Sequence, residues 1–333
     1  MQGSSDNESG EVTPHRAPSV RRAAAVGLVV GIPASLLFLW LAFRNASLDE
    51  VWDAARGAEL WLVCLAVAAF GGLYVFQASR WRVIAQPVEL RLTAMVEMVV
   101  GAVACNNVLP GRIGELFRAR WLAVAAPMPS GRALATVGLD RGCDILTLFA
   151  FLVVALPFVT SAAWVTRITV GAVALIALLF VLLLAARLYA RARHRDRHPR
   201  GRFRRIARDV VDTLAEPLGR RRVMRALGLS VIAWGWFAVA VWLVARSIGI
   251  ELDALDCVFV TGVLNLGVAL PSSPGFVGTY QWLAVAALGI LDVGREEALA
   301  FSILLQASWY VPTTIVGGFF VLFRLDWGLR GRR

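Results

Sequence analysis

Charged residues inside apolar stretches are the part of this sequence that could do chemistry. The segment 106–120, NNVLPGRIGELFRAR, follows an apolar run and carries three arginines and a glutamate. A helix that begins at Gly111, after the helix-breaking Pro110, would direct its free N–H groups and its positive dipole end at the break. Arg112 adds a full positive charge there. At membrane depth, this pattern predicts a pocket for an anion such as phosphate.

The residues around this break extend the predicted site. Asn106 and Asn107 offer amide donors just before it. Glu115 lies one helical turn beyond it and can pair with Arg112 or Arg118 at a spacing of three, or couple to a proton. We therefore include all five residues in the predicted substrate-binding set.

A second polar cluster is the stretch LDRGCD, early in another apolar segment. Asp140 and Asp144 share a helix face at i,i+4, and Arg141 is expected to point elsewhere. Charged side chains within a span face a cavity or a partner, and Arg118 or Arg120 is a suitable partner. Two readings stay open: a substrate site, or an internal network of ion pairs that is purely structural.

A second break, LPSSPG, repeats the spacing of the first. The sequence PGRIGE begins at Pro110 and has its second glycine at Gly114, and PGFVGT begins at Pro274 and has its second glycine at Gly278. A helix is again predicted to start at the Pro-Gly step, here at Gly275. The polar side chains of this second tip are all neutral: Ser272, Ser273, Thr279 and Gln281.

The elements that must position these residues are membrane spans. The chain has 333 residues, 58% of them hydrophobic. Windows of about twenty apolar residues match the length that crosses a bilayer. These windows are Ala23–Phe43, Leu60–Ser79, Ile168–Ala186, Ala226–Ala245 and Ala298–Phe323. The sequence therefore predicts an integral multi-pass membrane protein.

The order of elements predicts two inverted repeats. Each half reads span, loop helix, span, broken hairpin, span. The first half, 23–157, has these elements at 23–43, 48–58, 60–79, 92–126 and 133–157. The second half, 158–323, has them at 168–186, 202–218, 226–245, 255–291 and 298–323. The predicted fold is all-α, with six full spans and two re-entrant hairpins, 92–126 and 255–291, although two short spans per hairpin would give the same topology. Such inverted halves with broken helices are typical of secondary transporters.

Arginine distribution sets the predicted orientation. The net charge is +11 and no lysine occurs. Fourteen arginines lie in the loop 187–225, which we interpret as a cytoplasmic loop touching anionic headgroups and not as a nucleic-acid site. We count Arg80, after the second span, among the cytoplasmic flanking charges. The tails 1–22 and 324–333 are then cytoplasmic, the first of them disordered, and the location is the cell membrane.

Metal or cofactor chemistry is not expected. The four cysteines are scattered through apolar segments without metal-ligand spacing, and the three histidines lie in the polar tail or the basic loop. Neither pattern supplies ligands for a metal inside the membrane. We therefore predict no cofactor and no metal site.

Three motifs resemble those of the lysylphosphatidylglycerol synthase transmembrane, or flippase-domain, family. LPGRIGELFRARWL is similar to its first-hairpin motif, DRGCDILTL to its (Glu/Asp)-Arg-x-x-Asp motif, and PSSPGFVGTYQ to its second-hairpin stretch. The resemblance spans about residues 23–325 and implies a multi-pass bundle that moves aminoacylated phospholipids or polyprenyl-linked lipids between leaflets. Two residues depart from the pattern. Phe276 stands where the family often has glycine and Gln281 where it often has glutamate, which puts proton coupling there in doubt.

The leading hypothesis is a non-enzymatic lipid transporter or flippase for an anionic or aminoacylated phospholipid or a polyprenyl-phosphate-linked lipid. One alternative is a membrane-embedded transferase with Asp140, Asp144 and Glu115 as acid/base groups. Another is a non-catalytic partner of a lipid-modifying enzyme. The expected partners are membrane lipids, with homo-oligomers compatible with the sequence.

Overall fold

The structure is a computed structural model. It describes residues 33–44, 46–86, 88–109, 112–159, 202–215, 219–268 and 273–325. Several predictions lie outside the described residues. These are the tail 1–22, the start of the first span, the span 168–186, the parts 187–201 and 216–218 of the basic loop, nearly all of the C-terminal tail, and the site residues Pro110, Gly111 and Ser272.

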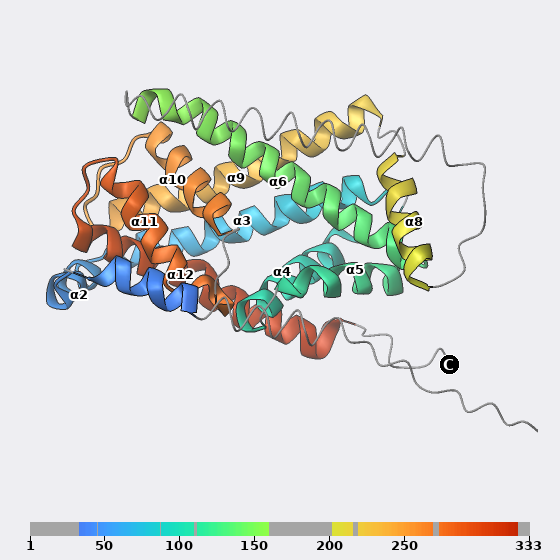
Figure 1. The fold of residues 1–333 in the computed structure, drawn as a ribbon, viewed down its shortest axis with the longest axis horizontal. Helices are drawn as coiled ribbons and strands as arrows, with labels where there is room; N and C mark the ends of the chain where they lie inside the picture. Colours follow the sequence, from blue (N-terminus) through green and yellow to red (C-terminus); the bar gives the residue numbers. More distant parts are fainter. Residues whose placement is uncertain are drawn as a thin grey trace, which may run out of the picture.

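Every regular element in the described ranges is helical, which confirms the all-α prediction for that part of the chain (Figure 1). A short helix, Pro33–Phe43, comes first. The labelled helices are α2 (Leu48–Arg56), α3 (Leu60–Ile84), α4 (Leu92–Val108), α5 (Gly114–Ala125), α6 (Ser130–Val159), α8 (Arg202–Ala215), α9 (Arg220–Ser247), α10 (Ala254–Gly267), α11 (Thr279–Gly289) and α12 (Arg295–Phe319). A π-helical turn, Phe320–Arg324, extends α12.

Four helices are long and apolar enough to cross a membrane: α3, α6, α9, and α12 with its extension. Each has 25 to 30 residues, and a helix rising 1.5 Å per residue needs about 20 residues to cross the hydrocarbon core. They run along the long axis of the molecule in Figure 1. Two of them, α3 and α9, pack against each other along their length, with Phe70 and Phe237 in an edge contact of 5.3 Å between ring centroids.

Two shorter helix pairs are broken where the sequence predicted hairpins. In the first broken pair α4 has 17 residues and α5 has 12, and in the second α10 has 14 and α11 has 11. The breaks are wider than predicted, because the returning helices begin at Gly114 and Thr279 and not at Gly111 and Gly275. Arg112 and Phe276 have left-handed backbone conformations, with φ of 51° and 61°. Such residues cannot continue a right-handed helix.

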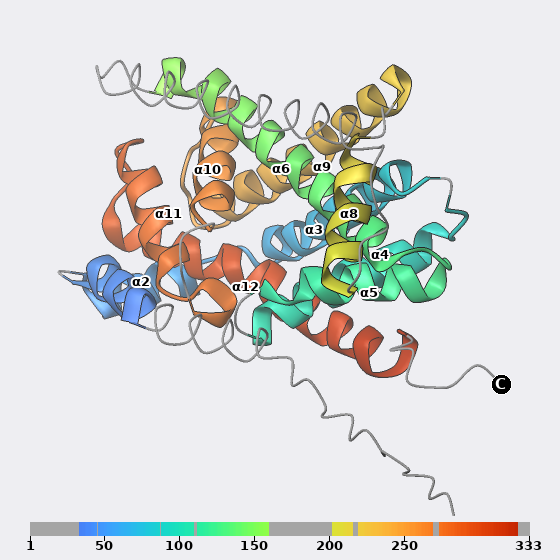
Figure 2. The ribbon, with the colours of Figure 1, turned by 45° about the vertical axis from the view of Figure 1, so that its right-hand side comes forward.

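The helices pack in pairs around α3 and α9. Helix α4 lies against α12, and α10 lies against α6. The returning helices then pack on the following long helices, α5 on α6 and α11 on α12. The two short amphipathic helices also pack on these long helices, α2 on α12 and α8 on α6, at opposite ends of the bundle (Figures 1 and 2).

Glycines permit the close approach of the broken pairs. A Cβ at Gly114 would lie 2.1 Å from the carbonyl oxygen of Ala102, in α4. A Cβ at Gly278, whose φ is +87°, would lie 2.2 Å from the carbonyl oxygen of Ser35. Backbone carbonyls cannot move aside cheaply, so the second glycine of each PGxxG sequence is required by packing.

We expect Gly114→Ala to lower the stability of the purified protein by at least about 2 kcal/mol, because overpacking against backbone forces α5 away from α4. Gly138→Ala is the matched control, since a Cβ there meets nothing within 4 Å. Thermal unfolding in detergent, followed by circular dichroism, measures both. Equal melting temperatures for the two variants would contradict the close packing.

Candidate functional site

A cluster of six ionic side chains lies between α3, α5 and α6. We call it the ion cluster: Arg80, Glu115, Arg118, Asp140, Arg141 and Asp144. Arg80 is fully buried and holds both aspartates of α6. Its Nε lies 2.7 Å from Asp140 Oδ1, and its Nη1 lies 2.5 Å from Asp144 Oδ1. One guanidinium thus bridges two carboxylates that are one helical turn apart.

Arg118 holds Asp140 from the opposite side. Its Nη2 lies 2.8 Å from Asp140 Oδ2, so Arg118, one of the two arginines that the sequence offered as partners, pairs with Asp140. Its guanidinium also lies 3.8 Å from the ring centroid of Trp81, a cation–π distance. Asp140 therefore accepts from arginines on two different helices, and it ties α3, α5 and α6 together.

Arg141 and Glu115 form the accessible edge of the ion cluster. Arg141 Nη1 lies 3.2 Å from Asp144 Oδ2 and 3.8 Å from Glu115 Oε1. The Arg141 side chain is 38% exposed and that of Glu115 is 27% exposed, whereas Arg80 and Asp140 are fully buried. A ligand could bind Arg141 or Glu115 without breaking the ion pairs of the buried residues.

Polar groups of α9 complete the ion cluster. Trp234 Nε1 donates to Asp144 Oδ1 at 2.9 Å, and Arg80 Nη1 donates to Ser230 Oγ at 2.8 Å. Thr147 of α6 donates to the same Ser230 oxygen at 2.8 Å. Charged groups removed from water are tolerated only with such paired and hydrogen-bonded surroundings.

The charges of the ion cluster balance, with three arginines against three carboxylates. Balanced charge lowers the cost of burial, but removing one partner leaves an uncompensated charge and costs about 3–5 kcal/mol. The buried members therefore hold the geometry, and the accessible edge is the part that could bind a ligand.

A central cavity of about 160 Å³ opens beside this edge. Its charged wall consists of Glu115, Arg118 and Arg141. Six aromatic side chains, from helices far apart in the sequence, form much of the remaining wall: Tyr74, Trp234, Phe237, Phe276, Tyr280 and Trp309. The cavity is large enough for several waters or for a small headgroup. Acyl chains would have to stay outside.

The two breaks meet beside this cavity. The Arg112 guanidinium donates to the carbonyl oxygen of Val268, at the end of α10, and lies 5.2 Å from the ring centroid of Phe276. The equivalent positions of the two PGxxG sequences are thus in direct contact. Part of the Arg112 guanidinium is thus occupied by a carbonyl and a ring of the second broken pair, neither of which carries a negative charge.

The predicted asparagines have structural partners. Asn106 Oδ1 accepts from the Gly114 amide at 2.8 Å and so caps the first turn of α5. Asn107 is buried, and its amide nitrogen donates to Thr314 Oγ1 of α12 at 2.8 Å. Neither residue lines the central cavity.

The second tip is held by neutral hydrogen bonds. Gln281 Oε1 accepts from the Gly278 amide at 2.7 Å, and its Nε2 donates to Gln306 Oε1 of α12 at 2.5 Å. Gln306 in turn donates to the Gly275 carbonyl at 2.6 Å. The Ser273 amide donates to Ser35 Oγ at 2.7 Å, and Thr279 is fully buried. Of the predicted site residues that the structure describes, only Glu115, Arg118 and Arg141 line the central cavity.

Two sequence interpretations were wrong. Arg80 is not a flanking loop charge, because α3 continues to Ile84 and buries it. Its burial follows the spacing of Leu73, Gln77, Arg80 and Ile84, all buried on α3, so helical periodicity continued past the apolar window could have found it. Arg141 does not point elsewhere, since it contacts both aspartates. Its spacing of three from Asp144 was a signal for that pair.

In the described ranges, no group of three or more His, Cys, Asp or Glu side chains is arranged to hold a metal ion. The carboxylates that do gather face arginines. The ion cluster and the cavity offer a ligand both charged and aromatic contacts.

Long apolar helices, broken helix pairs and buried ion pairs beside a cavity are the features of an integral helical membrane protein. The chain belongs to the lysylphosphatidylglycerol synthase TM region family, which it matches over residues 24–317. This match confirms the family resemblance of the motifs, and it agrees with a location in a membrane.

Two relatives give further comparison. The chain is 24% identical to the UPF0104 membrane protein PH1989 of Pyrococcus horikoshii, over 89% of this chain and 95% of that protein. It is 26% identical to the glycosyltransferase AglD of Haloferax volcanii, over 88% of this chain but 53% of that protein. The chain thus spans about half the length of AglD.

We expect Asp140→Asn to destabilise the protein by about 3–5 kcal/mol, because Arg80 and Arg118 lose their shared counter-charge in a buried site. Asp212→Asn is the control with the same chemical change, since Asp212 pairs with Arg208 at 3.6 Å and is 39% exposed. Such a surface pair contributes less than about 1 kcal/mol. Denaturation of both variants under one set of conditions measures the difference, and equal losses would show that the ion cluster does not hold the fold.

Proposed function

We propose that the protein moves a lipid with a phosphate-bearing headgroup between the leaflets of the cell membrane, and that the headgroup passes through the central cavity. The observation that carries the proposal is the cavity itself. It combines accessible ionic groups with aromatic walls, between two broken helix pairs, in a chain of the lysylphosphatidylglycerol synthase TM region family. Candidate lipids are an anionic or aminoacylated phospholipid and a polyprenyl-phosphate-linked lipid.

An inverted-repeat architecture supports transport. If α3, α4, α5 and α6 correspond to α9, α10, α11 and α12, each packing pair has a counterpart. The contact of α4 with α12 corresponds to that of α10 with α6, and the contact of α2 with α12 corresponds to that of α8 with α6. Inverted repeats with broken helices at their interface are the common architecture of alternating-access transporters.

The lengths of the broken helices favour re-entrant hairpins over pairs of short spans. The longest arm, α4, has 17 residues and a length of about 25 Å, less than the roughly 30 Å hydrocarbon core. The two tips are in contact through Arg112 and Phe276. With α2 and α8 at opposite ends of the bundle (Figure 1), each hairpin would enter from its own face and end near the midplane. Six full spans and two hairpins are the arrangement that we propose.

Charge distribution supports cytoplasmic termini. The basic residues Arg82, Arg220, Arg221 and Arg222 lie where α3 ends and α9 begins. The acidic residues Asp253, Asp256, Glu296 and Glu297 lie at the starts of α10 and α12. In both ribbon views these two groups of helix ends lie on opposite sides of the bundle. By the positive-inside rule, the first side is cytoplasmic.

The ion cluster suggests how a headgroup is held. Its phosphate would bind Arg141, whose partners are 3.2 to 3.8 Å away and whose side chain is partly exposed. Glu115 is the carboxylate that would be released from Arg141, or that would receive an amine in an aminoacylated headgroup. Asp140 and Asp144 stay paired with Arg80, so the framework persists while the edge exchanges partners.

Transfer chemistry is the alternative, because the name of AglD describes glycosyl transfer. That relative is nearly twice as long as the region shared with this chain. Asp140 and Asp144 hold arginines and do not line the central cavity, whereas Glu115, the third acid/base candidate, does line it. The other alternative is a non-catalytic partner of a lipid-modifying enzyme. That role does not explain the central cavity, because such a partner needs no substrate site of its own.

We expect proteoliposomes containing the protein to exchange a fluorescent phosphatidylglycerol or polyprenyl-phosphate lipid between leaflets, measured by dithionite quenching. Arg141→Gln should slow exchange at least about tenfold, because a charge-assisted hydrogen bond contributes about 1.5–3 kcal/mol. Arg120→Gln removes an exposed arginine of α5 outside the cavity and should leave the rate unchanged.

Absence of exchange for every phosphate-bearing lipid would contradict the proposal, as would an Arg141→Gln rate equal to that of the wild type. Covalent turnover of the lipid by the purified protein would instead support the transferase alternative. Exchange that requires a co-reconstituted lipid-modifying enzyme would support the partner role.

A further inference from the structure

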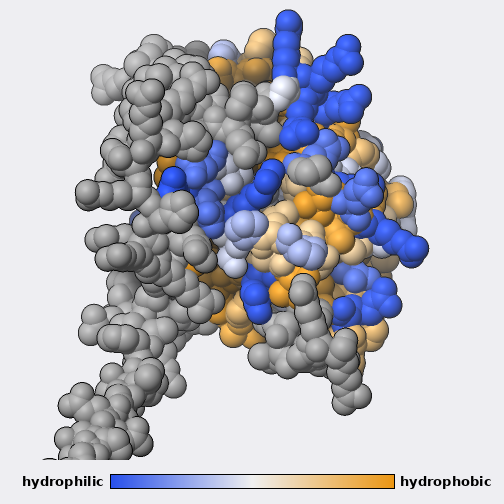
Figure 3. Space-filling model, turned by 90° about the vertical axis from the view of Figure 1, so that its right-hand side faces the viewer, coloured by the Kyte–Doolittle hydropathy of each residue, from blue (hydrophilic) through white to orange (hydrophobic). Residues whose placement is uncertain are grey.

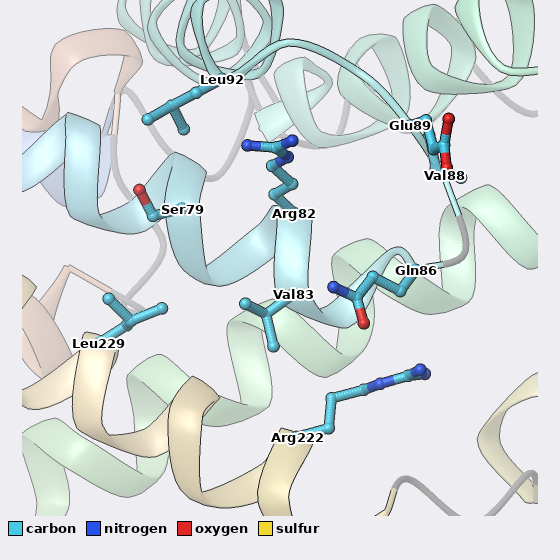
Figure 4. A pocket seen from close by; sticks show the side chains of 9 residues that line it. All are labelled: Ser79, Arg82, Val83, Gln86, Val88, Glu89, Leu92, Arg222 and Leu229. Carbon is cyan, nitrogen blue, oxygen red and sulfur yellow. The ribbon is translucent and has the colours of Figure 1, made fainter.

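A second pocket lies at the end of the bundle where α3 ends and α9 begins (Figure 4). It is open and has a volume of about 510 Å³. Seen from this end, hydrophilic side chains project around a hydrophobic centre (Figure 3). The polar side chains that line the pocket are Ser79, Arg82, Gln86, Glu89 and Arg222. None of them belongs to the ion cluster or to the central cavity.

The two arginines of this pocket have no protein partner among the described residues. Arg82 extends from α3 toward Leu92 and Glu89, and Arg222 extends from α9 past Gln86 (Figure 4). Neither makes a hydrogen bond or an ion pair with another described side chain. The charge of Arg80, only two residues earlier, is compensated by Asp140 and Asp144. The guanidinium groups of Arg82 and Arg222 are therefore available to a ligand.

The net positive charge of the lining indicates that the pocket binds an anion. Arg82 and Arg222 contribute two positive charges and Glu89 one negative charge, so the lining is net +1. A phosphodiester carries a single negative charge, whereas inorganic phosphate and phosphomonoesters carry nearly two at neutral pH. Guanidinium groups bind phosphate oxygens in paired hydrogen bonds, and the Gln86 amide adds a neutral donor. The lining therefore suits a phosphate group, and the apolar side of the pocket separates a lipid diester from free phosphate.

The position of the pocket indicates that the phosphate group belongs to a membrane lipid. It lies at the end of two long apolar helices, and Leu92, Val83 and Leu229 form its apolar side. Arginines at the ends of spans lie at the depth of lipid headgroups. Leu229 is followed directly by Ser230, which accepts from Arg80, so the pocket backs onto the walls of the ion cluster.

We propose that this pocket binds the phosphodiester of a glycerophospholipid headgroup in the adjacent leaflet. The site is separate from the central cavity, and its occupancy does not require that the protein transport lipid.

The test is binding of short-chain dioctanoyl-phosphatidylglycerol to the purified full-length protein, measured by native mass spectrometry and by tryptophan fluorescence. The double variant Arg82→Gln/Arg222→Gln should weaken the Kd at least about tenfold, because it removes the charge-assisted hydrogen bonds to phosphate. The matched control is Arg220→Gln/Arg221→Gln, which removes the same charge from the same end of α9 outside this pocket. Its Kd should equal that of the wild type.

Competition separates the two sources of phosphate. Inorganic phosphate should displace the lipid only at concentrations far above those of glycerophosphoglycerol, the deacylated diester. Equal displacement by inorganic phosphate would overturn the lipid assignment in favour of a free-phosphate site. Equal losses in the two double variants would show only general attraction to charge, and would overturn the pocket. Circular dichroism of both variants checks that folding is intact.

Discussion

Asp140 is the residue on which the arrangement of the first half depends. It accepts from Arg80 of α3 and from Arg118 of α5 while its own helix, α6, packs against both neighbours. In a medium of low polarity, an unpaired carboxylate or guanidinium is far more costly than in water. The three helices therefore hold one another in register by sharing charge. The geometry of the accessible edge, Arg141 and Glu115, follows from that fixed frame.

A second constraint acts where the two breaks meet. Arg112 and Phe276 occupy equivalent positions in the two PGxxG sequences, both have positive φ, and their side chains contact each other. A non-glycine residue in this region costs about 1 kcal/mol or more and persists only where its surroundings determine it. The contact between Arg112 and Phe276 across the breaks helps to hold both residues in this conformation. An ion pair, Arg118 with Asp140, joins α5 to α6, whereas a neutral pair, Gln281 with Gln306, joins α11 to α12. Charge is therefore concentrated on one side of the cavity.

Much of this arrangement could be predicted from the sequence, but particular parts of it could not. Apolar windows and the repeated PGxxG spacing predicted the long helices and both breaks, because membrane burial imposes length and proline imposes interruption. The cost of isolated charge predicted that the aspartates pair with Arg118 or Arg120, but it did not decide between these two arginines. Arg80 was missed because it directly follows an apolar window and precedes Arg82, which is exposed as a flanking arginine should be. The width of the breaks was missed because neither Arg112 nor Phe276 is a residue that marks positive φ. The aromatic walls could not be predicted, since they come from helices far apart in the sequence.

The central claim is that a phosphate-bearing headgroup enters the cavity, and photo-crosslinking tests it most directly. A benzophenone amino acid would replace Phe237, which lines the cavity, or Trp242, an exposed residue of the same helix α9. After irradiation in cell membranes, mass spectrometry identifies the attached lipid. The account predicts adducts at position 237 that are enriched in one class of phosphate-bearing lipid relative to those at position 242. No adduct at position 237, or the same lipid composition at both positions, would contradict it.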